Sequence, residues 1–188
     1  MTDPRSLALE VDRLRCALDA ASADLGFYDG AVAELVAMVG TLEGLDPLTN
    51  PEAVLAGLAR ICDSEFALLL RHRAGDEFSV IACTPDCAPV APGDRLRSAR
   101  LCSIVEERQT DRQPACVTYC EGLATDDGDL VARGVRRLSA VAYFYGDYRC
   151  LVMCNRRRPV ADEGGPNQQF YRTPEGAFLR IVIALFPL

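Results

Sequence analysis

A regular apolar seam in the first 42 residues limits the fold of this chain more than any other feature. Apolar or aromatic residues recur there at alternating steps of four and three, the a/d pattern of a heptad repeat sustained over about five heptads. The seam comprises Leu7, Val11, Leu14, Leu18, Ala21, Leu25, Tyr28, Val32, Leu35, Val39 and Leu42. This pattern predicts a coiled coil, with one helix lying on the chain's own sheet as the alternative.

Glycines weaken the second half of this helix. Gly26, Gly30 and Gly40 interrupt it, and each costs about 1 kcal/mol relative to alanine inside a helix. The first half carries charged residues such as Glu10 and Arg13 between the seam positions, where water would reach them. We therefore expect residues 1–45 to be an N-terminal dimerisation helix and the chain to be a parallel homodimer.

Residues 46–188 mix helical and alternating patterns and form the second expected unit. Asn50-Pro51 supplies a helix cap followed by proline at the first helical position. Hydrophobic periodicity and turn residues then predict the remaining elements in order. These are a helix at 51–62, a hairpin of strands at 66–73 and 78–83, a helix at 101–108, a strand at 115–120, a helical turn at 126–133, a hairpin at 137–145 and 148–155, and a closing helix at 174–185.

This order resembles the GAF domain family, and three segments carry the resemblance. The segment from Asn50 to Leu70 resembles the family's entry helix and first strand, and Gly93-Asp-Arg-Leu through Ile104-Val-Glu-Glu-Arg-Gln resembles its central helix with the turn after it. The segment Ser139 to Met153 resembles its last hairpin. The resemblance implies an α+β fold, a GAF-like and PAS-related central antiparallel sheet with helices on both faces, preceded here by the long N-terminal helix.

The resemblance also implies a function class. GAF domains serve as small-molecule pockets, as dimerisation modules and in some cases as enzymes, so fold alone leaves the activity open. We expect a sensory or regulatory domain that binds an unidentified small molecule and signals through a dimer to a partner protein. The cofactor, if any, is unknown from sequence.

The net charge and the hydropathy pattern limit the partners and the cellular location that we expect for this chain. The net charge is −7 and all 20 basic residues are arginine, which disfavours nonspecific nucleic-acid binding. The cluster Arg156, Arg157 and Arg158 is interpreted as a solvated rim in preference to a phosphate patch. No apolar run reaches the roughly 20 residues that span a bilayer, and the N-terminus lacks a signal pattern, so we expect a cytoplasmic protein without a membrane partner.

Nine cysteines make the chain cysteine-rich, and six of them form Cys-x-x-x-Cys pairs: Cys83/Cys87, Cys116/Cys120 and Cys150/Cys154. Two cysteines four apart on a strand share a face but lie about 13 Å apart, too far to bind one metal with sulfur ligands at about 2.3 Å, which argues against Cys116/Cys120 and Cys150/Cys154. Only Cys83/Cys87, where Pro85 can fold the chain, could close locally. Cysteines of different strands remain able to converge. We expect reduced, buried thiols and no metal, because free cysteine is among the most buried residue types.

A thiol-based redox protein, or an enzyme that uses Cys102, is the alternative function. Leu101-Cys-Ser-Ile-Val-Glu-Glu-Arg-Gln-Thr resembles the cysteine-bearing helix of the free-methionine-(R)-sulfoxide reductases, which are GAF-fold enzymes, and Cys102 matches their cysteine. The chain departs from that family at 124–138, which contains no cysteine. A bilin-binding GAF pocket pairs a cysteine with a nearby histidine, but His72 has no cysteine neighbour in the sequence. We therefore expect no catalytic residue.

Candidate pocket residues follow from the thiols and the aromatic side chains of the last strands. Small-molecule pockets combine apolar walls with a few polar groups, and phenols and thiols supply both. The candidates are Cys83, Cys102, Tyr119, Tyr143 and Tyr145.

Overall fold

The computed structural model describes residues 4–41, 50–85, 90–110, 115–121, 123, 127–157 and 174–185, with the backbone alone at 4–11, 20, 38–41, 115–121 and 185. These residues form five helices and six strands. The boundary expected between residues 45 and 46 lies outside the described residues. No described helix combines the length and apolar character that crossing a membrane requires.

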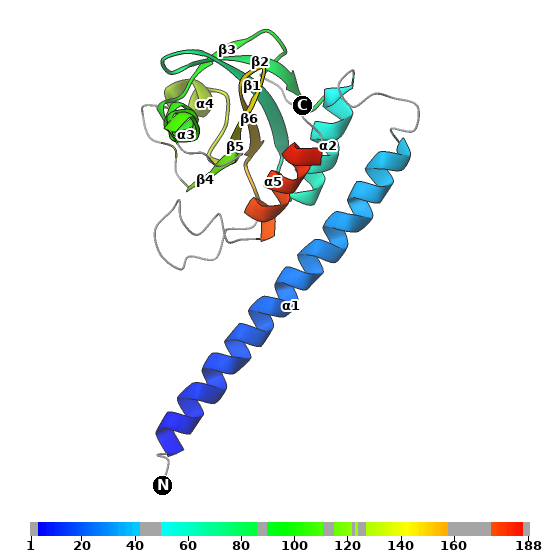
Figure 1. Ribbon diagram of the computed structural model, residues 1–188, viewed down its shortest axis with the longest axis vertical. Helices are drawn as coiled ribbons and strands as arrows, with labels where there is room; N and C mark the ends of the chain where they lie inside the picture. Colours follow the sequence, from blue (N-terminus) through cyan, green and yellow to red (C-terminus); the bar gives the residue numbers. More distant parts are fainter. Residues whose placement is uncertain are drawn as a thin grey trace.

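The N-terminal helix α1 runs without a break from Pro4 to Thr41 (Figure 1). It passes through both Gly26 and Gly30, and a Cβ added at either glycine would meet no described atom within 4 Å beyond the neighbouring residues and backbone of its own helix. The glycines are therefore not required by close packing within this chain. They weaken the helix intrinsically but do not end it.

The six strands form one antiparallel sheet in the order β3-β2-β1-β6-β5-β4. The strands are β1 (Phe66–Ala74), β2 (Glu77–Cys83), β3 (Arg95–Arg97), β4 (Ala115–Glu121), β5 (Arg137–Tyr145) and β6 (Asp147–Cys154). Both predicted hairpins are confirmed, and the α+β class with them. The short edge strand β3 corrects the expectation from the sequence, which placed these residues at the entrance to the central helix. Leu96 is buried between exposed Arg95 and Arg97, the alternation of a strand.

Helices cover both faces of the sheet (Figure 1). On one side lie α3 (Ala99–Thr110) and α4 (Gly128–Ala132), and on the other lie α2 (Pro51–Ile61) and α5 (Pro174–Leu185). Neighbouring residues of β1 divide between them: Leu69 joins the core under α2 and α5, and Leu70 joins the core under α3. Successive strand residues point to opposite faces, which is why β1 is apolar at consecutive positions.

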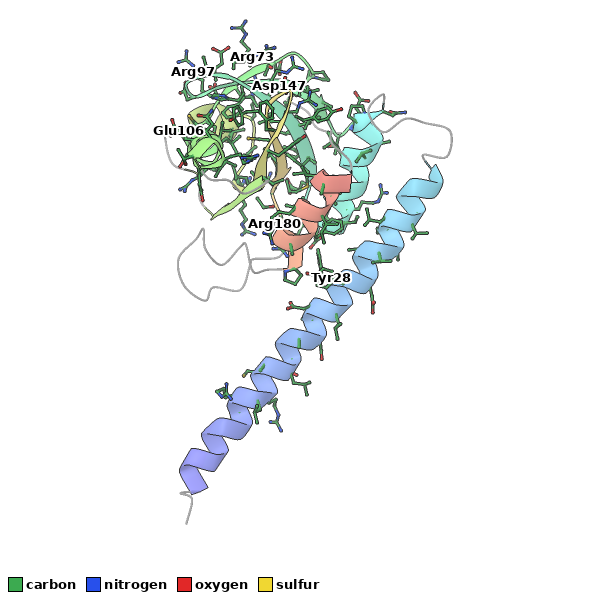
Figure 2. The ribbon with its side chains drawn as sticks, in the orientation of Figure 1. Tyr28, Arg73, Arg97, Glu106, Asp147 and Arg180 are labelled. Carbon is green, nitrogen blue, oxygen red and sulfur yellow. The ribbon has the colours of Figure 1, made fainter. Side chains whose placement is uncertain are left out.

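The second half of α1 lies against the α2 and α5 core. Ala31 is buried there, Phe27 and Leu35 pack against the same cluster, and the Phe27 ring meets Phe178 of α5 edge-on with centroids 5.9 Å apart. Six large apolar side chains of α1 remain exposed: Leu14, Leu18, Leu25, Tyr28, Val32 and Val36. Tyr28 is labelled beside the lower end of α5 in Figure 2. The helix thus contacts its own domain and still presents most of the described part of its seam to solvent.

Candidate functional site

Two aspartates at the start of α4 hold the segment between β3 and α3. Ser98 caps α3, its Oγ accepting from the Leu101 N–H at 3.1 Å, and donates to the buried Asp127 carboxylate. The Asp129 carboxylate accepts from the Arg97 N–H at 2.8 Å. These contacts satisfy polar groups around the start of α3 and fix α4 beside it. Asp126, from the same predicted cluster, lies outside the described residues.

The described space between α3 and the sheet is filled by apolar side chains. Phe78, Leu101, Ile104, Val105 and Leu130 are each at most 2% exposed. Such a layer has the density of a protein interior, so a ligand on this side must approach its edge or displace side chains.

Three thiols belong to this packed face. Cys150 and Cys154 are fully buried there, sharing a face as their four-residue spacing predicts, and Cys83 is 7% exposed. The Cys83 thiol donates to the carbonyl of Val90 at 3.4 Å. Burial raises the pKa of Cys150 above its ordinary value, so this thiol stays protonated. The three behave as small apolar side chains.

Cys102 lies on α3 at the border of this face and is partly exposed. Its thiol donates to the carbonyl of Gly75 at 3.1 Å and lies 3.6 Å from a carboxylate oxygen of Glu106. Partial burial, and after it the charge and hydrogen bond of Glu106, raise the pKa of Cys102. A reactive cysteine needs the opposite shift, because the thiolate is the nucleophile. This environment disfavours Cys102 as a catalytic residue.

His72 meets the same carbonyl, a proximity that sequence reasoning missed. The His72 Nε2–H donates to the Gly75 carbonyl at 2.8 Å, and its ring packs on Phe78 with centroids 5.2 Å apart. His72 and Cys102 therefore share one acceptor, although 30 positions separate them in the sequence. The hairpin turn at Gly75, which has a positive φ of 55°, brings the carbonyl to both. No sequence pattern signals this pair.

The predicted tyrosines lie apart from these thiols. Tyr143 is 2% exposed within the α2 and α5 core, and burial raises its pKa. Tyr145 is 41% exposed, with the Arg149 guanidinium 5.1 Å from its ring centroid. The side chain of Tyr119 lies outside the described residues. Cys83 and Tyr143 belong to opposite faces, so the candidates do not line one pocket.

Arginines gather at the tip of the β5–β6 hairpin. Asp147 forms ion pairs with the Nε atoms of Arg71 and Arg149, each at 2.6 Å. Beside them a surface hollow of about 560 Å³ is lined by Arg71, Arg73, Glu77, Ser79, Val80, Ile81, Gly93 and Arg95. Asp147 and Arg73 mark this end of the sheet in Figure 2. Most charges here are paired with one another.

A buried ion pair lies at the opposite end of the sheet, where α5 begins. Glu175 is 2% exposed, and its carboxylate lies 2.7 Å from Nη1 of Arg156 and accepts from Ser139 Oγ at 3.0 Å. Arg156 was expected on a solvated rim, but its side chain is only 16% exposed. The correction has a clear cause: the carboxylate comes from a helix distant in sequence, which no local pattern around Arg156 reveals.

The fold is that of GAF domains. The phycoerythrobilin-bound GAF domain of a cyanobacterial phytochrome superimposes with a TM-score of 0.54 at 12% identity, over 82% of this chain and 91% of that one. The corresponding phycocyanobilin-bound GAF domain gives 0.52 at 10% identity, over 82% and 90%. The chromophore-binding domain of Stigmatella aurantiaca bacteriophytochrome gives 0.52 at 16%, over 86% of this chain and 60% of that one. No family model and no curated protein matches the sequence.

Proposed function

We propose that this GAF-fold chain is a regulatory module that forms a homodimer through α1 and transmits the binding of a small molecule to a partner protein. The observation that carries the proposal is the division of α1 into two faces. One face, with Phe27, Ala31 and Leu35, is occupied by the chain's own core. The other face carries the exposed apolar stripe, which consists of Leu14, Leu18, Leu25, Tyr28, Val32 and Val36.

The two faces of α1 do not compete. A helix turns roughly 100° per residue, which places the exposed stripe about a third of a turn from the face that contains Ala31. The stripe extends from Leu14 to Val36, so it continues beyond the part of α1 that contacts the domain. A second chain is able to contact the stripe while each α1 keeps its own intramolecular contacts.

The apolar area of the stripe is sufficient for a dimer. Each fully buried leucine or valine contributes about 1.5–3 kcal/mol, and two copies of six exposed side chains are available. Association costs about 4–15 kcal/mol in lost freedom, which the burial of all these side chains exceeds and the burial of half of them offsets only in part of that range. A heptad pattern favours a second copy of this chain as the partner, because identical seams are self-complementary.

The ligand belongs, in this proposal, at the border of the α3 face. The bilin-bound neighbours are chromophore-binding GAF domains, and in this chain Cys102, His72 and Cys83 lie along that side of the sheet. The raised pKa of Cys102 favours a binding role over a thiol-based redox reaction. Native mass spectrometry of the purified protein would detect a retained ligand as added mass.

The dimer is tested by charge placed on the stripe. Leu14→Glu combined with Leu18→Glu puts two carboxylates from each chain into the seam, and we expect a dimer at tens of micromolar to become a monomer in analytical ultracentrifugation. Ala23→Glu is the matched control, since Ala23 is exposed on α1 away from the stripe. A monomeric parent protein, or a dimer that survives both seam substitutions, would refute the proposal.

A further inference from the structure

A polar cleft at the end of the sheet lies outside the proposed ligand face. It forms where β6 ends, β5 begins and β1 begins, and it encloses about 300 Å³. We call it the arginine cleft; its lining residues are Glu65, Gly134, Arg136, Arg137, Asn155, Arg156 and Arg157. Four of these seven residues are arginines, on a chain whose net charge is −7.

Asn155 holds the cleft in shape. Its φ of 54° lies in the left-handed region, which asparagine tolerates better than most residues. Its side-chain oxygen accepts from the Arg136 N–H at 2.7 Å, and its amide nitrogen donates to Glu65 at 2.7 Å and to the Gly134 carbonyl at 2.9 Å. One side chain thus joins three segments of the chain. The cleft is organised before any ligand arrives.

The inner arginines are already engaged. Arg156 is paired with buried Glu175, and Arg137 donates from Nη1 to the Arg156 carbonyl at 3.2 Å. The backbone N–H of Arg157 donates to the Asp63 carbonyl at 2.9 Å, which fixes the second segment of the cleft. These contacts set the positions from which the outer two guanidinium groups extend.

The two outer arginines differ, because no carboxylate among the described residues pairs with their guanidinium groups. Arg136 and Arg157 are exposed, and within the described part of the chain neither guanidinium forms an ion pair with a carboxylate. The acid that lines the cleft, Glu65, is hydrogen-bonded to Asn155. Like charges held together repel one another until an anion binds between them, and the field they produce attracts anions.

We propose that the arginine cleft is a binding site for a small phosphorylated molecule, whose phosphoryl group is held by Arg136 and Arg157. A guanidinium presents paired N–H donors that match phosphate oxygens in a bidentate geometry, which suits this anion better than a spherical one. The volume is at the lower end of the range for ligand pockets, enough for a phosphoryl group with a small body and too little for a folded macromolecule. This site shares no lining residue with the proposed dimer stripe or with the α3 face.

The test is a titration of the protein with inorganic pyrophosphate at low ionic strength. Binding is measured from the chemical shifts of the backbone amides in ¹⁵N NMR spectra. We expect saturable shifts at Gly134 and Asn155, and an affinity that Arg136→Gln combined with Arg157→Gln lowers at least tenfold. The control is Arg97→Gln combined with Arg100→Gln, which removes the same charge at the other end of the sheet and is expected to leave the affinity unchanged. Arg97 is labelled there in Figure 2.

Two outcomes would overturn the proposal. Equal weakening by both variant pairs would mean that pyrophosphate senses only net charge, and absence of saturable shifts at millimolar pyrophosphate would mean that no site exists. Repeating the titration with Leu14→Glu and Leu18→Glu separates this site from the dimer, since we expect a monomeric chain to bind the probe equally well. An unphosphorylated sulfonate of similar size serves as the comparison for phosphoryl specificity.

Discussion

At the scale of single residues, Glu175 is the most deeply buried acidic residue that the structure describes, at 2% exposed. Its burial raises its pKa, and Asp63 adds to this effect, whereas Arg156 and the hydrogen bond from Ser139 act in the opposite direction. Burial, and after it the Glu175 carboxylate, raises the pKa of Cys62, which lies in the core under α2 and α5. The cost of removing the Glu175 carboxylate from water therefore exceeds its attraction to the single guanidinium of Arg156.

This balance predicts how stability depends on pH. A carboxyl group with a raised folded pKa binds its proton more tightly in the folded state, so its contribution increases as pH falls through the folded value towards the ordinary value of glutamate. We expect the free energy of unfolding of the parent, relative to Glu175→Gln, to increase over that interval. Urea unfolding at several pH values measures it, and a constant difference between the two proteins would contradict the predicted shift.

At the scale of elements, the sequence predicts the helices and strands that local hydrophobic periodicity and turn residues determine. The predicted helix at 51–62 appears as α2, and the hairpin around Gly146 appears as β5 and β6, because spacing and turn residues determine both. The strand β3 has three residues, too few for a period to be recognised. The Arg156–Glu175 pair and the shared Gly75 acceptor depend on tertiary proximity, which sequence spacing does not contain.

In helix α1, the low helix propensity of two glycines is outweighed by the residues around them. Gly26 and Gly30 stay helical inside a 38-residue helix, although glycine is disfavoured there. We expect Gly26→Ala and Gly30→Ala each to stabilise the protein by about 0.5–1 kcal/mol, because a Cβ at either position meets no other atom within 4 Å. Thermal unfolding at a fixed protein concentration measures the gain. A loss of stability would place an unseen contact, such as a second chain, against the glycine.

At the scale of the whole molecule, a continuous set of contacts joins the arginine cleft to the proposed dimer helix. Arg156 lines the cleft and is paired with Glu175 in the first turn of α5. Phe178 lies one turn further along α5, on nearly the same side, and its ring meets Phe27 of α1. We expect an anion held by Arg136 and Arg157 also to attract Arg156 and to weaken its pair with Glu175, which would connect the cleft to α1 through α5.

This connection predicts that pyrophosphate changes the dynamics of α5 and not of the cleft alone. By hydrogen exchange followed with mass spectrometry, we expect bound pyrophosphate to slow exchange around Gly134 and Asn155 and to accelerate it in the first turn of α5 and around Phe27. In Glu175→Gln the cleft still binds, but Arg156 no longer engages a carboxylate on α5, so the acceleration is lost while the protection of the cleft remains. Changes confined to the cleft in the parent protein would show that the site binds anions without communicating with α1, because coupling requires a ligand to discriminate between two arrangements of α5.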